Sequence, residues 1–157
     1  MTGVDSTVVS FNNTGASPLM VYFSGIGETV GNGLIALSDD TTGLEMVFSI
    51  PQTSLSLDFG NDQAGYANPG DLAVLTLFQG ATQVAQFTVA MNCNDLMDQS
   101  IAGLFGAGFD RATFFYTNSS LDPIALTECV DNITFAPTPG AAALLGLGGL
   151  ALGRRRR

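Results

Sequence analysis

The sequence predicts an all-β fold, an antiparallel β-sandwich of the jelly-roll type, followed by a short C-terminal transmembrane helix. Short runs rich in β-branched and aromatic residues recur along residues 1–135, and turn-forming residues separate them. Composition agrees with strands and turns, because the chain has 19 Gly residues and no Lys, a usual filler of exposed helix faces. A length of 157 residues suits one domain with a sizeable core.

The expected strands follow one another along residues 1–135. Their limits come from clusters of Asn, Asp, Thr and Gly, which favour turns. We expect strands over 7–11, 19–24, 44–50, 53–59, 72–79, 82–91, 111–117 and 128–135. One short helix is expected over 95–104, where Asp95 stands in position to cap its first turn.

Two of these strands have informative patterns. Polar and apolar residues alternate in 53–59, with Leu55, Leu57 and Phe59 on one face and Ser54, Ser56 and Asp58 on the other, which is typical of a strand with one buried face. Strand 72–79 is apolar on both faces, which places it at the centre of the sheet. Gly80 and Ala81 join it to 82–91, and a two-residue loop with Gly first predicts a type II′ hairpin.

The charge balance excludes several classes of function. The chain has no His, which excludes Ser-His-Asp triads, Cys-His pairs and His-ligated metals. Residues 1–153 hold 14 acids and one base, Arg111, so their net charge is −13. Such an acidic body repels phosphate backbones, and we expect no nucleic-acid partner. We also expect no enzyme, since pairs of carboxylates, as in glycosidases, arise by chance among 14 acids.

The C-terminal tail is the most informative segment. None of the residues 140–153 is polar, and as a helix they would be about 21 Å long, just short of the usual bilayer span. The chain ends in four arginines that would stay on the cytoplasmic side and leave residues 1–135 outside. These arginines are Arg154, Arg155, Arg156 and Arg157. A buried core helix and a tail anchor on a cytosolic protein remain as alternatives.

The layout of this tail resembles a known signal. It consists of Pro137, Thr138 and Pro139, an apolar Gly/Ala/Leu run and a terminal Arg cluster. This arrangement is similar to the PEP-CTERM sorting signal of bacteria, with Thr138 at the position where that family usually has Glu. The resemblance implies that an exosortase, a membrane-embedded protease-like transferase, recognises the Pro-x-Pro element, removes the tail and releases or attaches the exported protein.

The body carries a second, weaker resemblance. Residues 109–114 (FDRATF) and 130–135 (VDNITF) resemble the closing strands of jelly-roll domains in PEP-CTERM proteins, which are similar in fold to carbohydrate-binding modules. In related carbohydrate-binding jelly rolls an Asp in the last strand helps to hold a structural Ca²⁺, and Asp131 matches it by position. Solvated acids forming local turns are the alternative. Val130 and Ile133 have opposite parity, so we also expect a β-bulge at Asp131 and Asn132.

The two cysteines are a further candidate pair. Cys93 and Cys129 are the only ones in the chain, and outside the cytoplasm we expect them to form a disulfide. Two separate buried thiols are the alternative. Stacking platforms for sugars are considered at the three tyrosines, for which an ordinary structural role is the alternative. They are Tyr22, Tyr66 and Tyr116.

The sequence therefore predicts an exported, non-enzymatic domain over 1–135 and a sorting tail over 136–157. We expect it to be anchored transiently in the membrane by its C-terminal helix and then to reside on the cell surface or in the extracellular matrix, with a structural or adhesive role. Extracellular polysaccharide is a candidate partner. Alternatives are a carbohydrate-binding module with a defined glycan ligand and a tail-anchored membrane protein. The first residues lack the basic and apolar regions of a signal peptide, so a truncated start is expected.

Overall fold

The computed structural model describes residues 4–5, 9–15, 17–23, 32–36, 41–61, 66–94 and 96–139. These residues form nine strands, and every pairing between them is antiparallel. The all-β antiparallel class predicted from the sequence is therefore confirmed. The strands are β1 (Val4–Asp5), β2 (Val9–Asn13), β3 (Leu19–Phe23), β4 (Asn32–Ala36), β5 (Leu44–Gly60), β6 (Leu72–Gln79), β7 (Thr82–Ala90), β8 (Gln99–Thr117) and β9 (Glu128–Pro137).

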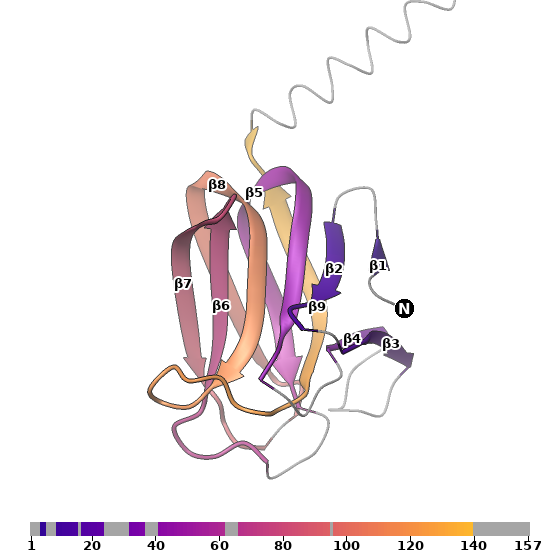
Figure 1. The fold of residues 1–157 in the computed structure, drawn as a ribbon, viewed down its shortest axis with the longest axis vertical. Coiled ribbons are helices and arrows are strands. Elements are labelled where there is room, and N and C mark those ends of the chain that lie inside the picture. Colours follow the sequence, from indigo (N-terminus) through magenta and orange to yellow (C-terminus); the bar gives the residue numbers. More distant parts are fainter. Residues whose placement is uncertain are drawn as a thin grey trace, which may run out of the picture.

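Two long strands organise the sheet. The strand order is β3-β4-β9-β5-β8-β6-β7, with β2 also paired to β5 and β1 to β2 (Figure 1). The first part of β5 pairs with β2 and with the end of β8, whereas its second part pairs with the start of β8 and with β9. The register of both pairings of β5 shifts around Gln52, between these two parts.

One part of the sheet consists of β2, the start of β5, the end of β8, β6 and β7, and the other consists of the start of β8, the end of β5, β9, β4 and β3. The hydrophobic core lies between these two parts of the sheet. Phe59, in the second part of β5, has its ring centroid 5.6 Å from that of Phe114, in the second part of β8, although its strand partners are Gln99 and Val130. The ring of Tyr116 is 5.4 Å from Phe114 and completes a cluster whose three side chains are almost fully buried. Alternate apolar residues of β5, β6 and β8 line this core. In β6 the residues between them, Val74 and Thr76, are buried as well, so this strand is covered on both faces.

Strand β6 and the hairpin after it match the sequence prediction. β6 covers Leu72–Gln79, and Gln79 pairs with Thr82 at the start of β7. Gly80 has a φ of +57°, a left-handed value that the first position of a type II′ turn requires and that Gly adopts without strain. The carboxylate of Asp110 accepts the Gly80 N–H at 2.9 Å, which links the hairpin to β8.

The predicted break between 44–50 and 53–59 is absent, because β5 continues through Pro51. Proline lacks a backbone donor, but a register irregularity in a sheet tolerates it. The next residue, Gln52, is fully buried and pairs with Phe109 on one side and Pro137 on the other. Pairing on both edges keeps the strand continuous where the sequence alone indicates a turn.

The helix predicted over 95–104 is wrong, since β8 begins at Gln99. Ile101 and Gly103 are buried, while Ala102 and Leu104 between them are exposed. This period of two is that of a strand. A Cβ at position 103 would lie 2.8 Å from the Phe87 ring, so Gly here lets β7 and β8 approach closely and also hides the alternation in the sequence.

Candidate functional sites at the end of β9 and on the outer face of β8

The Pro-Thr-Pro motif begins inside the sheet. Pro137 is the last residue of β9 and pairs with Gln52. The N–H of Thr138 donates to the carbonyl of Pro51 at 2.9 Å, and the Thr53 hydroxyl donates to the Ala136 carbonyl at 3.2 Å. Both prolines of the motif are exposed and Thr138 is half-buried. The first two residues of the motif therefore extend β9 along β5.

A glycine in β8 makes room for this extension. Gly108 has a φ of +89°, a value that L side chains rarely adopt. A Cβ placed there would lie 2.8 Å from Cγ2 of Thr138 and 3.4 Å from Cβ of Pro51. Thr138 thus sits against the backbone of β8 as well as that of β5.

Pro137 has its backbone nitrogen on the opposite edge of β9. In an antiparallel pair neighbouring residues point their backbone groups to alternate edges, so the bond from Thr138 to Pro51 turns Pro137 outward. Among the described strands, β4 lines this outer edge only beside residues 128–130. A missing N–H has no lost partner at an open edge, and proline there disfavours pairing with another chain.

The predicted bulge in β9 is confirmed. Ser56 pairs with Thr134 and Asp58 pairs with Asp131, so β9 holds one more residue than β5 over this interval. Asn132 has a φ of +49°, its N–H donates to Asp131 Oδ1 at 2.7 Å, and its side-chain amide donates to Asp58 Oδ2 at 2.7 Å. The bulge lets Val130 and Ile133, the apolar residues that flank it, both pack toward the core.

Asp131, the residue assigned to calcium by resemblance, faces one other carboxylate. Asp58 is its strand partner, and Asn132 bonds to both side chains. Over the described ranges, no group of three or more His, Cys, Asp or Glu residues has the arrangement of a metal site. Ca²⁺ takes about 6–8 oxygen ligands, so calcium at Asp131 stays a prediction that needs ligands beyond this pair.

The predicted disulfide is not formed in the structure, where Cys93 and Cys129 are both thiols. Cys93 is half-buried in the loop after β7, has a φ of +60° and points its sulfur toward the Met91 carbonyl at 3.6 Å. Cys129 is buried within β9. The side-chain amides of Asn94 and Asn92 donate hydrogen bonds to the Asp98 carboxylate and so close the loop that contains Cys93. The same hydrogen bonds hold the pKa of Asp98 below its usual value.

The three tyrosines do not form a common surface. Tyr116 is fully buried in the core and its hydroxyl donates to the Gly60 carbonyl, so its assignment as a sugar platform is wrong. It shares the inward parity of Phe114, which is why it cannot face solvent. Tyr66 is 60% exposed, and the side chain of Tyr22 lies outside the described part of the chain.

The outward-facing residues of β8 form a second candidate site that the sequence reasoning missed. Arg111 Nη1 lies 3.2 Å from Glu45 Oε1, and its guanidinium stacks 3.8 Å from the centroid of the Phe78 ring. Thr113 and Phe115 follow on the same face. The signal available in the sequence is the parity of 111, 113 and 115 against the apolar 112, 114 and 116.

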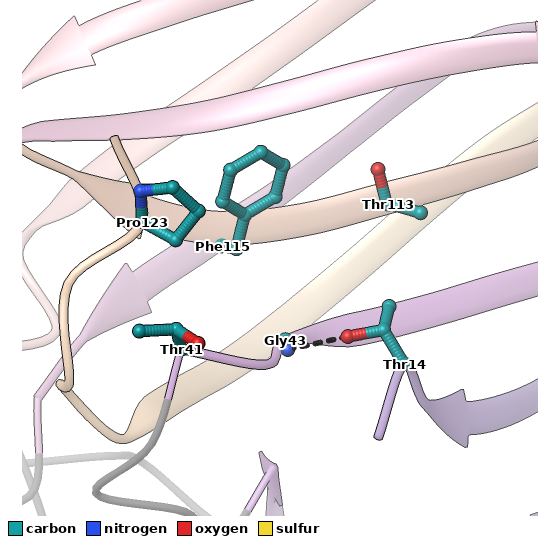
Figure 2. Close-up of a pocket in the computed structure, with 6 residues that line it drawn as sticks. All are labelled: Thr14, Thr41, Gly43, Thr113, Phe115 and Pro123. Carbon is teal, nitrogen blue, oxygen red and sulfur yellow. Dashed lines mark hydrogen bonds between the residues drawn. The ribbon is translucent and has the colours of Figure 1, made fainter. Parts of the chain in front are cut away.

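A shallow pocket of about 190 Å³ adjoins this face (Figure 2). Gly43 approaches β8 so closely that a Cβ would lie 2.5 Å from the Phe114 carbonyl oxygen, and its N–H donates to the Thr14 hydroxyl at 2.8 Å. The volume is below the roughly 300–1,000 Å³ of typical small-molecule sites, so the pocket fits one ring of a larger ligand. Its walls are Thr14, Thr41, Gly43, Thr113, Phe115 and Pro123.

No protein-family model, curated protein or solved structure matches this chain. Within the ranges that the structure describes, there is no helix with the length and apolar character needed to cross a membrane. The predicted transmembrane segment, 140–153, and the Arg cluster, 154–157, lie outside those ranges.

Proposed function

We propose that this chain is an exported, non-enzymatic protein of the cell surface or extracellular matrix, processed at its C-terminal tail by an exosortase-type enzyme. The observation that carries the proposal is the order of elements after the fold. The Pro-Thr-Pro motif, with both prolines exposed, begins at the last residue of β9, and the apolar run and four arginines come next. The nine strands of the described residues lie within 4–137, so removal of residues 140–157 leaves these strands intact.

The charge distribution supports an external body and an internal chain end. Among residues 1–153 the single base is Arg111, and Glu45 pairs with it, whereas the four remaining bases follow the apolar run without interruption. Positive residues beside a membrane span stay in the cytoplasm. An acidic, Lys-free domain outside would stay soluble at high local density through charge repulsion.

The jelly-roll type of the fold is part of the same proposal. We infer a jelly-roll sandwich, because the two parts of the sheet enclose one core and the long strands β5 and β8 pass through both parts. Such domains present flat strand faces and loops suited to structural or adhesive contacts. A tail-anchored form of the protein would be the state before processing.

Replacing Pro137 and Pro139 together by Ala tests the processing step. We expect the variant to remain full-length and membrane-bound in its native host, because the recognition element is lost while the apolar run remains. Immunoblots of membrane and extracellular fractions measure this, and Pro69→Ala, at an exposed loop proline, is the matched control. Normal maturation of the double variant would refute the role assigned to the motif.

A second candidate function, contact with neutral polysaccharide, is favoured by the outer face of β8. Three threonine hydroxyls and the Phe115 ring border the pocket (Figure 2), which suits hydrogen bonding to sugar hydroxyls and stacking on a sugar ring. The neighbouring Arg111–Glu45 pair is neutral overall and offers both donors and acceptors. An uncharged polyhydroxylated chain fits this chemistry better than an anionic one.

Phe115→Ala tests the polysaccharide candidate. In affinity electrophoresis through gels containing neutral polysaccharides, we expect the unaltered protein to be retarded and the variant to lose about fivefold in apparent affinity, since a ring–ring stacking contact is worth roughly 1 kcal/mol. Tyr66→Ala, at an exposed tyrosine away from the pocket, is the control. Equal mobility of the unaltered protein with and without every polysaccharide would remove this candidate.

A further inference from the structure

We propose that the folded domain controls its own processing, because the end of β9 must detach from β5 before an enzyme can take the Pro-Thr-Pro motif. This inference rests on the proposed function and concerns the regulation of that same site. The sequence places the motif after the last strand, but only the structure shows that Pro137 and Thr138 are docked on the sheet.

Three contacts hold the motif in place. The Thr53 hydroxyl binds the carbonyl of Ala136, and the Pro51 carbonyl accepts the N–H of Thr138. The Thr138 methyl group rests against Gly108, where a Cβ would be only 2.8 Å away. The inner edge of the motif is therefore occupied by β5, and one side of Thr138 is covered by β8.

The outer edge of the motif offers a processing enzyme an incomplete set of backbone hydrogen-bonding groups. Enzymes and receptors that bind extended peptides commonly add them as a strand and use backbone donors and acceptors in alternation. On the open edge Pro137 provides a carbonyl but no N–H, and the N–H of Thr138 is turned inward to Pro51. Complete strand pairing with an enzyme requires that the bond between Thr138 and Pro51 be broken first.

The detachment is confined to the last residues of β9. Phe135 packs its ring 5.2 Å from the Phe48 ring and belongs to the margin of the core. Ala136 and Pro137 after it are exposed, and Thr138 is half-buried against Gly108. Strand ends of this kind open locally at low cost without global unfolding. Processing should then follow the population of the opened end, and the stability of the whole domain should matter little.

Thr53→Ala separates this inference from the proposed function. In the full-length protein in detergent micelles, we expect the Thr138 amide to be protected from hydrogen exchange. The variant should exchange it roughly 3- to 10-fold faster, the effect of one lost hydrogen bond. In the native host the variant should mature faster by a similar factor in pulse-chase immunoblots. Thr53→Ser keeps the hydroxyl, and Thr88→Ala removes an exposed threonine on β7; both should behave as the unaltered chain.

Two results would overturn the inference alone. One is a Thr138 amide that exchanges at the unprotected rate in the unaltered protein. The other is a Thr53→Ala variant with faster exchange but an unchanged rate of maturation. Absence of any processing of the unaltered chain would instead refute the proposed function, and this inference with it, even if Thr138 proves protected.

Discussion

Replacing Phe114 by alanine is expected to lower the free energy of unfolding by about 3–5 kcal/mol, a large share of the roughly 5–15 kcal/mol that stabilises an ordinary domain. Phe114 is fully buried, and its ring lies 5.6 Å from that of Phe59 and 5.4 Å from that of Tyr116. Its loss leaves a cavity at the point where the two parts of the sheet meet. Urea unfolding followed by circular dichroism measures the change.

The adjacent residue supplies the control for this experiment. Phe115 has the same side chain on the same strand but is half-buried on the outer face, beside the pocket (Figure 2). Phe115→Ala should therefore cost clearly less than Phe114→Ala, because fewer of its contacts are lost. Equal losses of stability in the two variants would contradict the placement of the core between the two parts of the sheet.

The second large effect is expected from the C-terminal arginines. Replacing Arg154–Arg157 by Ser should move most full-length protein from the membrane fraction to the medium. The apolar run is short for a span, and each arginine near an anionic leaflet contributes about 1 kcal/mol, so four together shift the partition by roughly a thousandfold. Cell fractionation with an antibody against the body gives the ratio.

Arg111→Ser is the matched control for charge, because it removes the fifth basic residue from the body. This variant loses the contacts with Glu45 and Phe78 but keeps the tail, so its membrane fraction should be unchanged. If the tail variant stays in the membrane as firmly as the unaltered chain, the arginines do not hold the C-terminal end in the cytoplasm.

The predictions from sequence succeeded where the deciding signal is local. The strand over Leu72–Gln79 and its hairpin follow from an apolar run and a Gly-first loop, both contiguous in sequence. The bulge in β9 follows from the parity of Val130 and Ile133, which only an extra residue can reconcile with one core. These features depend on backbone geometry that neighbouring residues set.

The failures occurred where distant segments decide the structure. Continuity of β5 through Pro51 depends on Gln52 pairing with strands on both sides. The start of β8 is obscured because small residues such as Gly103 carry no apolar signal while fitting against the Phe87 ring.

At the candidate site, too, the sequence predicts local features but not contacts between distant segments. The sequence places the Pro-Thr-Pro motif directly after the last strand, but not its docking against Gly108, about 30 residues earlier. The disulfide prediction for Cys93 and Cys129 rested only on the presence of two cysteines. The sequence does not show where their sulfurs point or which hydrogen bonds hold the loop that contains Cys93.

The most direct test of the account is the intact mass of the protein recovered from outside its native cells. We predict a mature chain that contains the described strands through β9 and lacks residues 140–157. Recovery of the chain only from the cytosol, freely soluble and still carrying Arg157, would contradict it.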